Sequence, residues 1–89
     1  MYKIIKPRGT GKTTDIIKLA HENDAIIVCA VPRYVQQLAE VLGYEHIQVI
    51  DYATYILFAN NYQKSFVIDE IDGLLNKLKV IGYSLSEED

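Results

Sequence analysis

The most constraining feature of this sequence is an uninterrupted apolar run, AIIVCAV, at residues 25–31. A strand that is apolar at every position is buried on both faces, which is typical of a parallel sheet covered by helices. Pro32 ends the run, and we expect an amphipathic helix next, stopped by Gly43. The apolar face of that helix, spaced i, i+3, i+4, i+7, comprises Val35, Leu38, Ala39 and Leu42.

The same alternation of short apolar runs and helix-period segments extends along the chain and predicts an α/β fold. Further strands are expected at residues 2–5, 47–50, 64–70 and 79–86. A first helix is expected at about 12–22, with one face formed by Ile16, Ile17 and Ala20. A last helix after residue 70 has the apolar stripe Ile71, Leu74, Leu75 and Leu78. The 89 residues predict one small domain, residues 1–89, with about five mostly parallel strands and helices on both faces.

Residues 51–61, DYATYILFANN, fit two interpretations. Asp51 is a suitable N-cap for a helix. The apolar face of that helix would comprise Tyr52, Tyr55, Ile56 and Ala59. The aromatic and β-branched content would equally suit a strand. Of the two, we expect the helix.

A glycine loop, PRGTGKTT at residues 7–14, lies between the first expected strand and the first expected helix. Phosphate binding needs backbone N–H groups that point into a concavity, and a helix N-terminus supplies them with a favourable dipole. Gly9 and Gly11 permit a close approach of the backbone that a Cβ would hinder. Lys12 is placed to reach the β- and γ-phosphates of a nucleotide, and Thr13 to offer its hydroxyl to Mg²⁺.

A second motif, FVIDE at residues 66–70, places two carboxylates after three apolar strand residues. A phosphoanhydride hydrolase needs this combination beside its phosphate loop. Asp69 is expected to hold Mg²⁺ through water, and Glu70 to orient or deprotonate the attacking water. An apolar run that ends in Asp-Glu is a weak signal alone, but it becomes a strong one when paired with the glycine loop upstream.

PRGTGKTT and FVIDE resemble the Walker A and Walker B motifs of the P-loop NTPases, in the branch that includes helicases, AAA-type ATPases and viral packaging motors. The resemblance implies a three-layer, RecA-like domain that binds ATP with Mg²⁺. It implies metal binding by Thr13 and Asp69 and a catalytic role for Glu70. The nucleotide-binding residues that it implies are Arg8, Gly9, Thr10, Gly11, Lys12, Thr13 and Thr14.

The loop departs from the Walker A pattern G-x-x-x-x-G-K-[ST] at its entrance, where Lys6 stands in place of the first glycine. An added lysine near the phosphates could help or obstruct binding. Arg8 resembles the arginine of phage terminase large subunits that is assigned the role of a cis-acting arginine finger. In that interpretation Arg8 is catalytic and stabilises charge on the γ-phosphate. The alternative, a solvated loop arginine, stays open.

Composition narrows the functional classes. A net charge of −3 and a pI of about 5.3 argue against a strong, salt-dependent grip on nucleic acid, so that partner is not favoured. The single Cys29 forms no intrachain disulfide, and His21 and His46 lack a Cys or His at metal-ligand spacing. The sequence shows no signal peptide and no long apolar span, so we expect no membrane association and a cytoplasmic location, in the host cytoplasm if the chain is phage-encoded.

The leading hypothesis is an ATP-binding P-loop protein, of phage or prophage origin, with weak Mg²⁺-dependent ATP hydrolysis. Motors of this branch close two lobes or subunits around ATP, so we expect a single lobe to need a protein partner or self-association. Tyr34, Tyr44, Tyr52 and Tyr55 are candidates for an exposed partner-binding patch. The alternative is a catalytically inactive scaffold that binds and regulates a larger ATPase, and the sequence leaves turnover open.

Overall fold

The computed structural model describes residues 11–78 and alternates helices with strands. Its elements are α1 (Lys12–Glu22), β1 (Ile26–Cys29), α2 (Pro32–Val41), β2 (Val49–Asp51), α3 (Tyr52–Phe58), the 3₁₀ turn η1 (Ala59–Asn61), β3 (Phe66–Ile68) and α4 (Ile71–Lys77). The α/β class is confirmed for this part of the chain. The strands expected at 2–5 and 79–86 lie outside the described residues, and the five-stranded sheet stays a prediction.

The three described strands form one parallel sheet in the order β2-β1-β3. Ile27 of the central strand is paired with Val49 on one side and Val67 on the other. All four residues of β1 are buried, as the apolar run predicts. The strand is shorter than the run, however, because the chain leaves the sheet after Cys29 to begin α2, and Val31 is 60% exposed.

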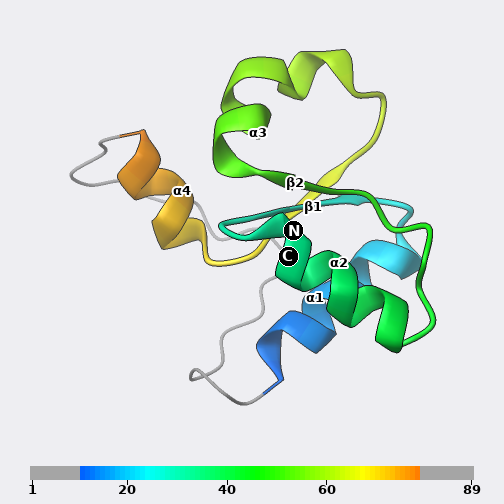
Figure 1. Ribbon diagram of the computed structural model, residues 1–89. Helices are drawn as coiled ribbons and strands as arrows, with labels where there is room; N and C mark the ends of the chain where they lie inside the picture. Colours follow the sequence, from blue (N-terminus) through cyan, green and yellow to red (C-terminus); the bar gives the residue numbers. More distant parts are fainter. Residues whose placement is uncertain (1–10, 79–89) are drawn as a thin grey trace, which may run out of the picture.

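Successive side chains of β1 enter different apolar clusters, one on each face of the sheet, because strand side chains alternate. Ile27 and Cys29 pack with the helices α1 and α2, whose buried residues are Ile16, Ile17, Ala20, Val35 and Ala39. Ile26 and Val28 pack on the other face, with Ile50, Tyr52 and Leu74. Figure 1 shows α1 and α2 on one side of the sheet and α3 on the other, so the described part of the chain has three layers.

The helical interpretation of residues 51–61 is confirmed for α3 and its cap. The Asp51 carboxylate accepts a 2.7 Å hydrogen bond from the backbone N–H of Thr54. This bond lowers the pKa of Asp51, because it favours the charged carboxylate. The expected apolar face is buried only at its start: Tyr52 is buried, whereas Ile56 is 39% exposed.

The apolar stripe predicted for α4 is also buried only in part. Leu74 is buried, but Ile71 and Leu78 are 46% and 47% exposed. The helix makes a close approach to α3 through Gly73, where an added Cβ would lie 2.8 Å from the ring of Tyr52. The contact between α3 and α4 is therefore made at Gly73, and the apolar side chains of Ile71 and Leu78 take no part in it.

Burial of Cys29 generates a pH-dependence prediction. Burial raises the pKa of the Cys29 thiol from its ordinary value of 9.0 to about 11, aided by the negative charges of Asp69 and Asp51. Between these values the unfolded thiol ionises and the folded one does not, so stability present below pH 9.0 is lost as the pH rises toward 11. In this range the free energy of unfolding should fall by up to about 1.4 kcal/mol per pH unit.

Urea unfolding of the wild type and of Cys29→Ala between pH 8 and 11 measures this contribution, because the other titrating groups are common to both proteins. We expect the free energy of unfolding of the wild type to fall more steeply than that of the variant above pH 9. Parallel curves would contradict the assignment.

Candidate functional site: the start of α1 and the end of β3

Gly11 precedes the first turn of α1 and has the left-handed conformation, with φ 81°. A residue with a Cβ is strained at this φ, so the position favours glycine. The helix it opens has 11 residues, and its first turn carries Lys12 and Thr13. The N–H groups of a first helical turn lack intrahelical partners and attract anions, which is the property expected of a phosphate-binding loop.

Asp69 and Glu70 follow β3 at its carboxyl end. The backbone N–H of Asp69 donates to the carbonyl of Val28 at 2.9 Å, so this residue is still held against the central strand. The Asp69 side chain is buried, with 7% exposure. Glu70 is exposed and has φ 57°, a left-handed conformation that is uncommon for a residue with a side chain and is enriched at functional sites.

The structure brings these two segments together. The Thr13 hydroxyl donates a long hydrogen bond of 3.4 Å to the Asp69 carboxylate, across 56 positions of sequence. Lys12 Nζ forms an ion pair with Glu70 Oε1. The four residues expected to contact phosphate, metal and water thus lie side by side. Arg8, Gly9 and Thr10 lie outside the described residues, so their predicted roles stay predictions.

The Asp69 carboxylate has one partnered oxygen and one orphaned oxygen. Oδ2 accepts from Thr13, whereas Oδ1 is buried and has no hydrogen-bond partner among residues 11–78. A buried carboxylate oxygen left unpaired is costly, and such a group is normally satisfied by an ordered water or a bound ion. The donor set of a carboxylate and a hydroxyl fits Mg²⁺, a hard cation bound through one or two carboxylates together with phosphate oxygens and waters.

The described residues contain no group of three His, Cys, Asp or Glu side chains that could hold a metal ion. A fully protein-ligated metal centre is therefore not built in this part of the chain. The pairing of Thr13 with Asp69 fits the other kind of site, in which a bound phosphate completes the coordination.

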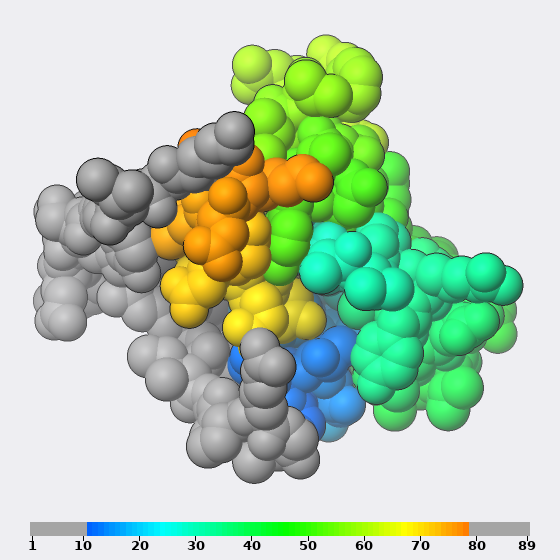
Figure 2. Space-filling model, turned by 60° about the vertical axis from the view of Figure 1, so that its left-hand side comes forward, coloured from blue at the N-terminus to red at the C-terminus, as the bar shows by residue number. Residues whose placement is uncertain are grey.

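A hollow of about 340 Å³ lies over the start of α1, within the size range of small-molecule sites. Its lining comprises Gly11, Lys12, Thr13, Thr14, Tyr34, Leu38 and Glu70. Figure 2 shows the start of α1 (blue) between the segment that follows β3 (yellow) and α2 (blue-green). One wall therefore presents cationic and hydroxyl groups, and α2 contributes an apolar and aromatic wall.

The exposure of the tyrosine side chains differs from the sequence prediction. Tyr34 is 61% exposed and lines the hollow. The prediction of an exposed patch is wrong for Tyr52. This residue is 7% exposed and packs in the core beneath the Asp69–Glu70 segment. Burial raises its pKa, and the nearby Asp69 charge adds to the shift. The helical spacing marks Tyr52 as an apolar-face residue, but no local sequence pattern marks its hydrogen bonds, because their acceptors lie 17 and 18 residues away.

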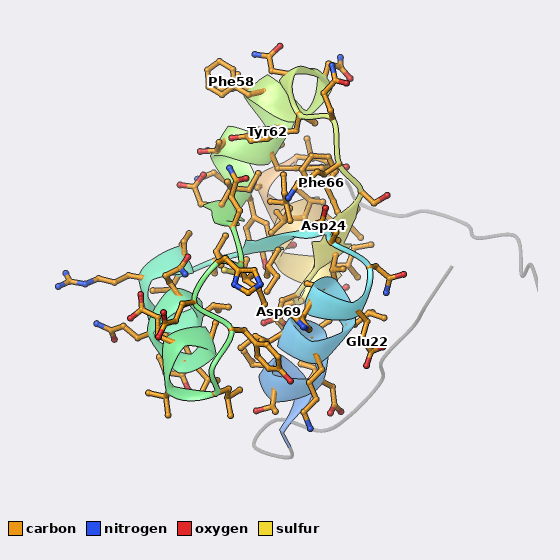
Figure 3. The ribbon with its side chains drawn as sticks, turned by 90° about the vertical axis from the view of Figure 1, so that its right-hand side faces the viewer. Glu22, Asp24, Phe58, Tyr62, Phe66 and Asp69 are labelled. Carbon is orange, nitrogen blue, oxygen red and sulfur yellow. The ribbon has the colours of Figure 1, made fainter. Side chains whose placement is uncertain are left out.

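The histidines lie at the opposite end of α1, where the ring centroids of His21 and His46 are 5.6 Å apart. They line a smaller hollow of about 80 Å³ together with Asp24 and Lys64, which form an exposed ion pair. Figure 3 shows Glu22 and Asp24 at this end, Asp69 in the interior, and Phe58 far from both at the tip of α3. The candidate site is thus confined to the start of α1 and the end of β3.

No protein-family model, curated protein or solved structure matches the chain. No helix within residues 11–78 is long and apolar enough to cross a membrane.

The Lys12–Glu70 ion pair predicts that Glu70 competes with anions for Lys12. We expect Glu70→Gln to bind tripolyphosphate about two- to fivefold more tightly than the wild type, the range set by a partly exposed ion pair. Calorimetric titration without divalent metal measures this. Glu22→Gln removes the same charge at the far end of α1 and should leave the affinity unchanged. Equal affinities of wild type and Glu70→Gln would show that the pair does not occlude Lys12.

Proposed function

We propose that this protein binds ATP with Mg²⁺ at the start of α1 and hydrolyses it slowly, as a P-loop protein. The observation that carries the proposal is the pairing of Thr13 with Asp69, across 56 positions of sequence, and of Lys12 with Glu70, beside a hollow that Lys12, Thr13 and Glu70 line. These four side chains are of the types that triphosphate chemistry uses: an ammonium group, a hydroxyl group and two carboxylates. The orphaned oxygen of buried Asp69 supports a ligand at this point.

In this proposal the N–H groups of the first turn of α1 and the Lys12 ammonium bind the phosphates. Thr13 and Asp69 hold Mg²⁺, which neutralises phosphate charge when bound. Lys12 is paired with Glu70 in the structure, so an incoming triphosphate has to take the place of the Glu70 carboxylate. The same exchange releases Glu70 beside the bound phosphates, where it acts on water.

The reaction is attack of a water oxygen on the γ-phosphorus. The bond from the γ-phosphorus to the bridging oxygen breaks, the electron pair leaves with ADP, and Glu70 accepts the proton of the water. Glu70 follows a strand held by the sheet, and its left-handed backbone aims the side chain toward the start of α1. Arg8, in the glycine loop, is proposed to stabilise γ-phosphate charge.

Calorimetric titration with ATP and Mg²⁺ tests the site. We expect binding by the wild type and a loss of about 10- to 100-fold in affinity for Lys12→Ala, because charge-assisted hydrogen bonds to phosphate disappear. Lys18→Ala, an exposed lysine on the same helix, is the matched control and should bind normally. Absence of binding by the wild type would overturn the proposal.

An inactive scaffold that regulates a larger ATPase is the second candidate, and one observation favours it. Three consecutive apolar residues at the end of α3 are exposed, Ile56, Leu57 and Phe58, with Leu57 at 72%. A partner surface there would be remote from the nucleotide site. Phosphate release from ATP separates the two functions: activity lost in Glu70→Gln supports turnover, whereas binding without release favours the scaffold.

A further inference from the structure

Tyr52 lies directly beneath the segment that carries the two carboxylates. Its hydroxyl, shared between two acceptors, donates to the backbone carbonyl of Asp69 at 2.7 Å and to that of Glu70 at 2.9 Å. Tyr52 is the first residue of α3 and follows β2 immediately, so its backbone is anchored to the edge of the sheet. One buried side chain therefore contacts both site residues.

The Asp69–Glu70 segment needs such a contact because it leaves the sheet in an unfavourable conformation. The N–H of Asp69 is held by Val28, but Glu70 has a left-handed φ and provides no side-chain cap for α4. The Glu70 carbonyl also accepts from Gly73 N–H at 2.9 Å in the first turn of α4. Orientation of the two carbonyls toward one hydroxyl fixes the peptide planes on either side of the Glu70 Cα.

The position of the Tyr52 ring is itself fixed from the other side by α4. An added Cβ at Gly73 would lie 2.8 Å from ring carbon Cε2 and from the hydroxyl oxygen, so the helix packs directly on the phenol. The ring is thus enclosed and its donor is held in place.

We propose that Tyr52 is a positioning residue, which sets the Asp69 carboxylate against Thr13 and the Glu70 carboxylate against Lys12 through their backbone carbonyls. A rotation about the Glu70 backbone would swing its carboxylate away from α1, and it would move Asp69 relative to Thr13. The expected effect of Tyr52 on metal and nucleotide binding rests on the proposed function. Its effect on the backbone of Asp69 and Glu70 does not. Tyr52 itself touches neither Lys12 nor Thr13 through a described hydrogen bond.

Tyr52→Phe tests the proposal, since it removes the hydroxyl and keeps the ring against Gly73. Tyr55→Phe is the matched control, on the same helix, with its ring packed on Phe66 at a centroid distance of 4.9 Å. In the nucleotide-free protein we expect amide exchange of residues 70–73 to accelerate about tenfold in Tyr52→Phe, the effect of one lost hydrogen bond, and to stay unchanged in the control. Unchanged exchange in Tyr52→Phe would overturn the proposal.

ATP binding with and without Mg²⁺ supplies the second readout. We expect Tyr52→Phe to bind metal-free ATP at least as tightly as the wild type, since Glu70 is then held less firmly against Lys12, and to lose about 10- to 100-fold of the Mg²⁺-dependent gain, as when a residue that orients a metal ligand is removed. Equal losses with and without metal would indicate a merely structural role and overturn the proposal. A wild type that fails to bind ATP would overturn the proposed function and the metal arm together, while the exchange comparison would still decide whether Tyr52 holds the segment.

Gly73→Ala is the second variant, in case Tyr52→Phe does not fold. Its new methyl group displaces the ring and should accelerate exchange at residues 70–73 as the loss of the hydroxyl does. Protection retained in Gly73→Ala would contradict the role assigned to the hydroxyl.

Discussion

The parallel pairing of β1 with both of its neighbours is the constraint on which the rest of the structure depends. Because the pairing is parallel, the carboxyl ends of β1, β2 and β3 share one edge of the sheet. The helix α1 ends close to the amino end of β1, so its first turn lies at that same edge. The position of the candidate site therefore follows from strand direction. Lys12 and Thr13 contact Glu70 and Asp69, respectively, at the carboxyl edge of the sheet.

Folding stability and the proposed ligand site make opposite demands at this edge. The apolar clusters on the two faces of β1 bury all four of its side chains and fix the sheet. At the edge, the chain keeps a buried carboxylate with an orphaned oxygen and a residue in a left-handed conformation, both of which cost free energy of folding. Tyr52 offsets part of this cost by satisfying two carbonyls. A site that folds with its ligand groups pre-positioned has less to reorganise on binding.

Much of the described fold could be predicted from the sequence because its signals are local. The period of Ile16, Ile17 and Ala20 marks α1, and the Asp51 cap marks α3. The end of β1 at Cys29 and the exposed flanks of α4 could not be predicted, since they depend on where neighbouring elements pack. The pairing of Lys12 with Glu70 is hinted at by two motifs, whereas the contribution of Tyr52 depends on tertiary contacts that no spacing in the sequence encodes.

The central claim is that the start of α1 and the end of β3 form one ligand site. Amide chemical shifts of the protein, titrated with Mg²⁺ and a non-hydrolysable ATP analogue, test it most directly because they report every residue at once. We expect the largest changes at residues 11–14 and at Asp69 and Glu70, with little change around His21 and His46. Changes confined to the histidine end of α1, or changes at α1 without any at Asp69 and Glu70, would contradict the account.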